Sequence, residues 1–320
     1  MSFNEWKEVK LEDVVDTISK RHKFDKDKII LINTSDVLEG KVLNHEYVQN
    51  ENLKGQFKKS FQKNDILYSE IRPQNKRFAY VDFQSDDYVA STKLMVLRKK
   101  NEMITSNFLY QILKSDDLIN ELQVIAESRS GTFPQITYNE LSRMKIKLPP
   151  LDEQKAIAHI LSTLDDKIEV NNEINKTLEN MAQAYFDDMF PNVAAGDTTI
   201  GEYITPKRGK NLLSKDAISG EVPVIAGGLS PATYHNVSNT QSPVITISAS
   251  GANAGFVNLW TVPVWSSDSS FIDYGMTKDV YFWYVMLKKR QKEIYDSQTG
   301  SAQPHIYPKH ITIMPTIKLN

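Results

Sequence analysis

The sequence predicts a mixed α/β (α+β) fold in which two similar lobes are joined by one long coiled-coil-type helix. Two observations predict it. After Pro149 and Pro150 the chain shows an uninterrupted helical pattern with a heptad apolar repeat, and short strand-like and helix-like segments recur in the same order before and after that helix. A chain of 320 residues is also long enough for two domains of roughly 100–150 residues each.

The first lobe is predicted over residues 1–150 and the second over 191–320, because five segments of one resemble five of the other in the same order. A helix is expected near 106–126 and another near 278–296. The matching pairs are DILYS and PVITIS, FAYV and GFVN, YVAST and PVWSS, NFLYQILKS and YFWYVMLKK, and SGTFPQI and TGSAQPHI.

The joining helix is predicted over residues 151–190. The adjacent prolines end the first lobe, because proline lacks a backbone donor and restricts the residue before it. Asp152 and Glu153 then place negative charge on the first turn, where the helix dipole favours it, and neither Gly nor Pro interrupts the stretch before Pro191. About 38 helical residues would span about 57 Å.

An apolar seam follows this helix with alternating spacings of four and three residues, which is typical of a coiled coil. A seam of this kind needs a partner helix. Asn171 and Asn175 lie within it, either as selectors of register and partner or simply facing solvent or another protein. Asp187 and Asp188 place negative charge at the C-terminal end of the helix, where the helix dipole opposes it. Contact with a basic partner is the only explanation that the sequence offers for them. The predicted interface residues are Ile157, Leu161, Leu164, Ile168, Asn171, Asn175, Leu178 and Tyr185.

Composition excludes several kinds of protein. No apolar run approaches the roughly 18 residues that a membrane span needs, the N-terminus has no signal pattern, and there is no cysteine, so we expect a cytoplasmic chain without thiol chemistry. The six histidines show no metal-ligand spacing, so we expect no metal ion and no cofactor. Charge is uneven: residues 151–190 carry 3 Lys and 9 Asp or Glu, whereas each lobe has a net charge of +2.

With these features, the chain resembles the specificity subunit of a type I restriction–modification system over essentially its whole length. The resemblance is most specific at PPLDEQ and the following ILSTLDDKIEVNNEINKTLENMAQAYFDDMF, and looser at ILYSEIRPQNKRFAYV and ITISASGANAGFV. It implies two target-recognition domains on a spacer helix, which read a split double-stranded DNA target and bring adenine-N6 methyltransferase (modification) subunits and a restriction or motor subunit to it. It implies no catalytic residue in this chain.

The chain departs from the family pattern at its end. The family places a second spacer helix after the second lobe, and this sequence stops at 312–320, where that helix would start. We therefore expect a second copy or another chain to supply the missing helix in trans, unless the chain is a truncated, inactive specificity subunit. A monomer whose unpaired helix was fully protected in hydrogen exchange would contradict this expectation.

Candidate DNA contacts lie on basic or small-residue loops after strand-like runs. A basic loop projecting from a sheet can bind phosphate or guanine, whereas the alternative is a solvated hairpin loop. The uncharged loop at 248–255 can approach a DNA backbone closely through its glycines, and a plain tight turn is its alternative. The predicted DNA-binding residues are Ser69, Arg72, Lys76 and Arg77, Arg21 and Lys23, Lys207, Arg208 and Lys210, and Ser250 and Asn253.

A second function stays open on the sequence alone, namely a coiled-coil adaptor that binds proteins and has no DNA specificity. The net charge of −2 fits an adaptor better than a strong DNA binder. An enzyme ranks third among these functions, because the sequence shows no paired carboxylates, catalytic triad or metal-ligand set at credible spacing. The salt dependence of DNA affinity separates the first two functions, because only phosphate contacts release counterions.

Overall fold

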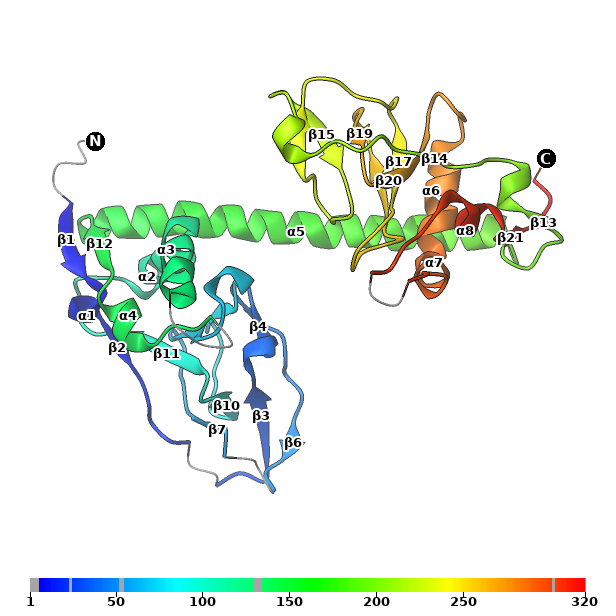
Figure 1. Cartoon of the computed structure of the whole chain (residues 1–320). Coiled ribbons are helices and arrows are strands. Elements are labelled where there is room, and N and C mark those ends of the chain that lie inside the picture. The colour runs from blue at the N-terminus through cyan, green and yellow to red at the C-terminus, as the bar shows by residue number, and fades with distance from the viewer. Residues whose placement is uncertain (1–5, 23–24, 52–54, 129–133, 301–302, 320) are drawn as a thin grey trace. The chain divides into compact units, whose positions relative to one another are not determined.

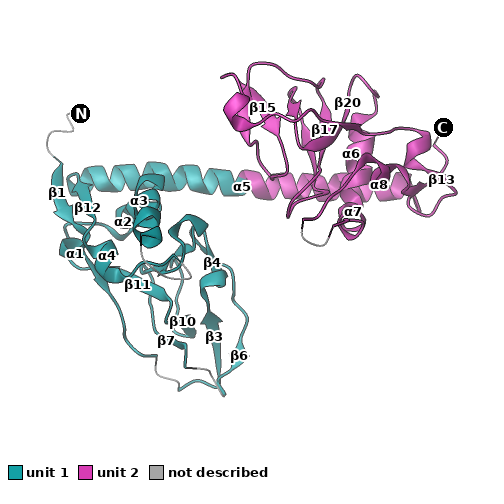
Figure 2. Cartoon of the chain, in the orientation of Figure 1, with its two compact units in different colours: residues 1–170 teal, residues 171–320 magenta. Residues whose placement is uncertain are grey.

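The computed structural model describes residues 6–22, 25–51, 55–128, 134–300 and 303–319. The chain divides into two compact units, Met1–Val170 and Asn171–Asn320 (Figure 2). The long helix α5, Leu151–Met189 (Figure 1), contributes its first half to unit 1 and its second half to unit 2 (Figure 2). Its bounds agree with the expected 151–190 to within one residue, so the helix prediction is confirmed.

Unit 1 contains two four-stranded sheets, ordered β2-β11-β8-β9 and β6-β3-β10-β7, and the small pair β1-β12. In chain order its elements are β1 (Lys7–Lys10), α1 (Leu11–Val14), β2 (Val15–Thr17), β3 (Lys28–Ile32), η2 (Thr34–Asp36), β4 (Val37–Leu38), β5 (Lys41–Val42), β6 (Val48–Gln49), β7 (Phe57–Lys59), β8 (Ile66–Ser69), η3 (Pro73–Asn75), β9 (Phe78–Tyr80), β10 (Tyr88–Ser91), β11 (Leu94–Lys99), α2 (Ser106–Leu113), α3 (Asp116–Glu127), α4 (Tyr138–Ser142) and β12 (Lys145–Leu148).

Unit 2 repeats most of this topology, with one sheet ordered β14-β20-β17-β18, a second, three-stranded sheet ordered β16-β15-β19, and the small pair β13-β21. The predicted repeat of the two lobes is therefore confirmed. Its elements are β13 (Thr198–Thr199), η4 (Ile200–Glu202), β14 (Lys207–Arg208), η5 (Ser214–Asp216), β15 (Val222–Ile225), β16 (Thr233–His235), β17 (Val244–Ser248), β18 (Val257–Trp260), β19 (Trp265–Ser266), β20 (Ser269–Asp273), α6 (Val280–Lys289), α7 (Gln291–Asp296), α8 (Pro308–Thr312) and β21 (Pro315–Thr316).

The expected single helices near 106–126 and 278–296 are each broken into two, which corrects the sequence prediction. Ser115 ends the run of α2 because its hydroxyl accepts from the Leu118 amide at 3.5 Å and so caps α3. Arg290 separates α6 from α7. Its buried guanidinium donates to Glu293 at 2.6 and 2.7 Å and to the Pro315 carbonyl at 2.7 Å.

The central strands β8 and β17 are buried on both faces, which explains why their sequences are continuous apolar runs and do not alternate. In unit 1, Ile66 and Tyr68 belong to the core under the helices, while Leu67 belongs to the core shared with β3 and β10. In unit 2, Ile245 and Ile247 pack under α6 and Val244 packs on the opposite side. Each central strand therefore fixes the loop that follows it.

Gln154 fastens the start of α5 to unit 1 and explains the motif LPPLDEQ. Its side chain is buried, donates to the carbonyls of Met103 at 2.8 Å and Pro149 at 3.0 Å, and accepts from the Thr105 amide at 3.0 Å. Ala158, one turn later, is buried in the same core. The prolines end the lobe, and Gln154 then fixes the direction in which the helix leaves it.

In unit 2, the end of α5 packs on α6. Phe186 lies 5.0 Å from Phe190 and 5.4 Å from Phe282 between ring centroids, and Tyr284 donates to Glu179 at 2.6 Å. Asp187 forms an ion pair with Lys289 at the C-terminal end of α6. The acidic residue that opposed the dipole of α5 thus meets a lysine of its own lobe.

In the described residues, no helix has the length and apolar character needed to cross a membrane.

In unit 1, an ion pair with a buried carboxylate links β11 to the residue before β8. Arg98 on β11 donates from Nε and Nη2 to the two carboxylate oxygens of Asp65, at 2.6 and 2.7 Å, and the Asp65 side chain is only 1% exposed. Asp65 also accepts from the Gln62 amide at 2.8 Å. The planar, bidentate geometry compensates the carboxylate for its lost hydration.

We predict that Arg98→Ala lowers the free energy of unfolding of unit 1 by about 3 kcal/mol, because it leaves the buried Asp65 carboxylate uncompensated. The matched control is Lys99→Ala, which removes a surface pair with Glu102 and should change stability by less than about 0.5 kcal/mol. Hydrogen exchange of the β8 and β11 amides during denaturant unfolding measures both. Equal losses for the two variants would contradict the prediction.

Candidate nucleic-acid interface

The loop after β8 and the loop after β17 have the same backbone hydrogen bonds. In unit 1, the Arg72 amide donates to the Pro134 carbonyl at 3.0 Å and the Ile136 amide to Glu70 at 2.8 Å. In unit 2, the Gly251 amide donates to Pro304 at 3.1 Å and the Ile306 amide to Ala249 at 2.9 Å. The bridges Ile71↔Gln135 and Ser250↔His305 also correspond. Position 72 of unit 1 is therefore equivalent to position 251 of unit 2.

Both loops begin and end in the left-handed region of backbone conformation. Arg72 and Lys76 have φ of 46° and 51°, and their equivalents Gly251 and Gly255 have φ of 83° and 92°. Glycine adopts this conformation freely, whereas a residue with a Cβ loses about 1–2 kcal/mol in it. Unit 1 therefore keeps two strained cationic residues where unit 2 has glycine.

The residues of unit 1 that are predicted to bind DNA near β8 differ in their surroundings. Arg77 donates from Nη1 to the carbonyls of Ser35 at 3.0 Å and Val37 at 3.3 Å, and Lys76 pairs with Asp116 at 2.9 Å. Ser69 is buried, and its hydroxyl accepts from the Ile71 amide at 3.0 Å. Arg72 is exposed. Ser69 and Arg77 thus shape the loop, while Arg72 lies at its surface.

In unit 2, Asp268 brings together two predicted residues that are far apart in sequence. Its carboxylate accepts from Arg208 Nη2 at 2.8 Å and from the Ser250 hydroxyl, and its carbonyl accepts from the Ala249 amide at 3.1 Å. The equivalent link in unit 1 joins Lys93 to Glu70 at 3.3 Å. Sequence reasoning missed Asp268, although it is a lone acid between strand-like runs in the segment WSSDSS.

Lys207 and Lys210 are exposed on either side of this link. Gly209 between them lies so close to the β19–β20 turn that a Cβ would meet the Ser266 carbonyl oxygen at 2.4 Å. Only glycine allows this approach, which keeps Arg208 beside Asp268. Asn253 is half-buried, and its carbonyl accepts from the Phe256 amide at 2.9 Å.

The other predicted basic residues differ in their surroundings. Arg21 is exposed and forms a backbone bridge with Lys59, and Lys23 lies outside the described residues. Burial lowers the pKa of the Lys59 ammonium, which donates to the carbonyls of Thr92 at 3.0 Å and Leu94 at 2.8 Å. Lys59 is therefore held inside its lobe.

The predicted seam of α5 is exposed for most of its length. Ile157 is the exception, because it packs against the core of unit 1. Asn171 and Asn175 are exposed as well. Of the apolar residues in the seam, Leu161 is 39% exposed, Leu164 52%, Ile168 60%, Leu178 56% and Tyr185 64%.

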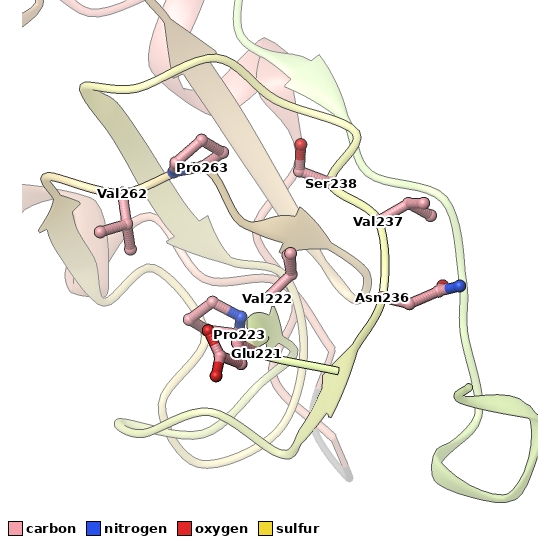
Figure 3. A pocket seen from close by; sticks show the side chains of 8 residues that line it. All are labelled: Glu221, Val222, Pro223, Asn236, Val237, Ser238, Val262 and Pro263. Carbon is pink, nitrogen blue, oxygen red and sulfur yellow. The ribbon is translucent and has the colours of Figure 1, made fainter. Parts of the chain in front are cut away.

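An open hollow of about 530 Å³ lies in unit 2 at the ends of β15 and β16 (Figure 3). Its lining includes Val222, Pro223 and Val262, with Glu221 as its one carboxylate. This lining offers no set of groups for acid–base or nucleophilic chemistry. Across the ranges that the structure describes, no three His, Asp or Glu side chains gather to hold a metal ion.

Comparison with known proteins gives one family. Residues 4–180 match the family description "Type I restriction modification DNA specificity domain". The chain is 41% identical over 225 residues to the type I restriction enzyme HindI specificity subunit of Haemophilus influenzae, a match that covers 69% of this chain and 49% of the relative. The chain thus spans about half the length of that relative.

Solved structures give a likeness in fold. The crystal structure of a type I restriction-modification system S subunit from M. genitalium superposes with a TM-score of 0.51 at 20% identity, covering 91% of this chain and 79% of that one. The HsdS subunit from Thermoanaerobacter tengcongensis gives a TM-score of 0.47 at 19% identity, covering 98% of this chain and 85% of that one.

The two glycines of the unit 2 loop give a matched prediction. An added Cβ at Gly255 would meet Ile294 Cγ2 at 2.9 Å and Ile306 Cγ1 at 3.2 Å, whereas one at Gly251 would meet nothing within 4 Å. We expect Gly251→Ala to lower the stability of unit 2 by about 1–2 kcal/mol from backbone strain alone. Gly255→Ala should lose about 1–3 kcal/mol more from overpacking.

Denaturant unfolding followed by hydrogen exchange of the β17 and β18 amides measures both glycine variants. Equal destabilisation by the two would show that the crowding at Gly255 relaxes without loss.

Proposed function

Because this chain belongs to the family of type I restriction modification DNA specificity proteins, whose domain matches residues 4–180, we propose that it reads a bipartite DNA target, one half with each unit. This match, which covers more than half of the 320 residues, is the observation that carries the proposal. The repeated topology of the two units supports it, because a split target needs two readers of similar build.

In unit 1, Arg72 is the proposed base- or phosphate-binding residue, because it is exposed at the start of the β8–β9 loop. The guanidinium can bind guanine in the major groove or a phosphate with two parallel hydrogen bonds. Lys76 contributes charge beside it, while Ser69 and Arg77 hold the loop in shape. Arg21 and Lys23 are proposed as phosphate contacts.

In unit 2, we propose that Lys207, Arg208 and Lys210 bind phosphates and that the loop with Ser250 and Asn253 meets the DNA at close range. A link through Asp268 holds Arg208 and Ser250 together before DNA arrives. Fixing both donors in advance reduces the conformational entropy lost on binding.

The exposed seam of α5 is the proposed docking surface for protein partners. The relative from Haemophilus influenzae is a specificity subunit of a restriction enzyme, so the proposed partners are adenine methyltransferase (modification) subunits and a restriction subunit. A further helix, from a second copy or another chain, is a proposed occupant too. The chemistry would belong to those partners, and the chain would work in the cytoplasm beside chromosomal DNA.

The coiled-coil adaptor without DNA specificity is the alternative function. The exposed seam fits both functions, but the family match favours DNA recognition. Affinity for DNA that falls steeply with salt distinguishes them, since each neutralised phosphate contributes about −0.9 to the slope of log affinity against log salt.

We predict that co-expressing the chain with its methyltransferase subunits adds N6-methyladenine at a new split motif, two short blocks with an unspecified gap. Sequencing that detects the modified base, in cells with and without the chain, measures this. Lys207→Ala should weaken binding to all sequences and reduce the salt slope by about one, without changing the motif. If no motif appears and DNA affinity ignores salt, the adaptor function is favoured.

We predict that Leu164→Glu abolishes association with the partner subunits, because a charge at the centre of an apolar seam cannot be buried. Leu164 is 52% exposed, so the lobes themselves should remain folded. Asp166→Lys, which reverses an exposed charge on the face of the same helix opposite the seam, is the control. Light scattering of co-purified complexes reads the outcome, and a Leu164→Glu complex of unchanged mass would exclude the seam as the interface.

A further inference from the structure

Asp268 lies in a turn of unit 2 that is otherwise buried. The turn joins β19 to β20, and Asp268 is the only residue of the described range 266–273 that is not buried. Its side chain is 34% exposed. The turn is held to the second sheet of the unit, because the Ser267 amide donates to the Ile225 carbonyl at 2.8 Å. The carboxylate is therefore held at one place on the surface by a rigid turn.

The basic segment 207–210 is fastened to the same turn. The Gly209 amide donates to the Ser269 carbonyl at 2.8 Å, and the Lys210 amide donates to the Ser266 carbonyl at 2.9 Å. These hydrogen bonds continue the pairing of β14 with β20. The backbone of the basic segment is thus fixed relative to the turn.

The Asp268 carboxylate orients two side chains. It accepts from Arg208 Nη2 at 2.8 Å and from the Ser250 hydroxyl. The Arg208 side chain is 42% exposed, and its guanidinium makes no other hydrogen bond among the residues that the structure describes, so further N–H donors remain for a ligand. The Ser250 proton is directed at the carboxylate, so the Ser250 oxygen offers its lone pairs, which suit the amino group of a base.

Unit 1 shows that the turn does not require an acid at this position. The carbonyl of Lys93 accepts from the Glu70 amide at 3.1 Å, just as the carbonyl of Asp268 accepts from the Ala249 amide at 3.1 Å. The same backbone link therefore forms with a lysine or with an aspartate. The acid of unit 2 is explained by the two side chains that it binds and not by the turn that carries it.

Resting on the proposed function, we propose that Asp268 is a specificity-determining positioning residue for the half-target of unit 2. It aims the Arg208 guanidinium at one phosphate, which fixes the register of the unit on the duplex. It also presents Ser250 as an acceptor for the amino group of adenine or cytosine in the major groove. The carboxylate repels other phosphates that approach. Asp268 therefore lowers affinity for DNA in general and raises discrimination between sequences.

The first experiment uses the full chain co-purified with its methyltransferase subunits and measures affinity for duplexes with and without the target. Asp268→Asn should raise affinity for non-target DNA, lower the ratio of target to non-target affinity about tenfold, and relax the methylation motif at one base of one half. Glu221→Gln is the matched control, because it removes one exposed carboxylate from the same unit, at the hollow beside β15. It should leave the ratio and the motif unchanged.

Two further variants separate positioning from charge. Asp268→Glu keeps the charge but moves the carboxylate by one methylene, so it should bind non-target DNA like the wild type and still show a lower ratio. Adding Asp268→Asn to a chain that carries Arg208→Ala and Ser250→Ala should change the ratio by less than about twofold, because no side chain remains to be positioned.

The outcomes distinguish this inference from the function on which it rests. A wild-type complex that methylates no split motif and binds DNA independently of salt would overturn the proposed function. A wild type with a motif, together with Asp268→Asn of unchanged ratio and motif, would overturn the inference alone, and a lowered melting temperature beside an unchanged motif would assign Asp268 a structural role only. If Asp268→Asn yields no folded complex, a wild-type ratio for Asp268→Glu rejects the inference.

Discussion

Burial of one central strand on both faces is the constraint on which each unit depends. Strands β8 and β17 each supply side chains to two cores at once. A slip of one residue in register would move every side chain of the strand into the opposite core, where it would not fit. The loops after them inherit this rigidity, since each loop is also hydrogen-bonded to the segment before the last strand of its unit. A base-reading loop needs such support, because an arginine fork discriminates bases only when its backbone is fixed.

The two units show how one scaffold can carry different surfaces. In each unit, a backbone hydrogen bond joins the loop after the central strand to the turn before the neighbouring strand of the sheet. Side chains reinforce it, those of Lys93 and Glu70 in unit 1 and those of Asp268 and Ser250 in unit 2. The lysine of unit 1 is replaced by an aspartate in unit 2 while the hydrogen-bonded frame is kept. The frame therefore tolerates changes of charge at its surface, which is the property that divergence of target specificity requires. The buried strands, by contrast, retain apolar residues in both units.

Periodicity predicted much of this architecture, because the heptad seam and the repeated strands are local patterns. The long helix was predicted to within one residue, and the order of strand-like segments predicted the repeat. The break at Ser115 was missed, since a serine cap looks like any polar position within a helix. Asp268 and Gln154 were missed for a different reason. Their partners lie 18 to 60 residues away, and only the folded chain brings such partners together.

Helix α5 differs in surface chemistry from the basic segments of the two units. Its seam is apolar, and the stretch 151–190 carries a net charge of −6, so it would repel DNA phosphates and favour contact with protein. The β8–β9 loop with Arg72 and the segment 207–210 with Arg208 on β14 are polar and basic, which suits a highly charged, hydrated duplex and not an apolar partner. A helix of the opposite charge would compete with the loops for DNA. On the proposed function, the acidic character of α5 would direct DNA to these basic segments, and its apolar seam would keep protein partners on the helix.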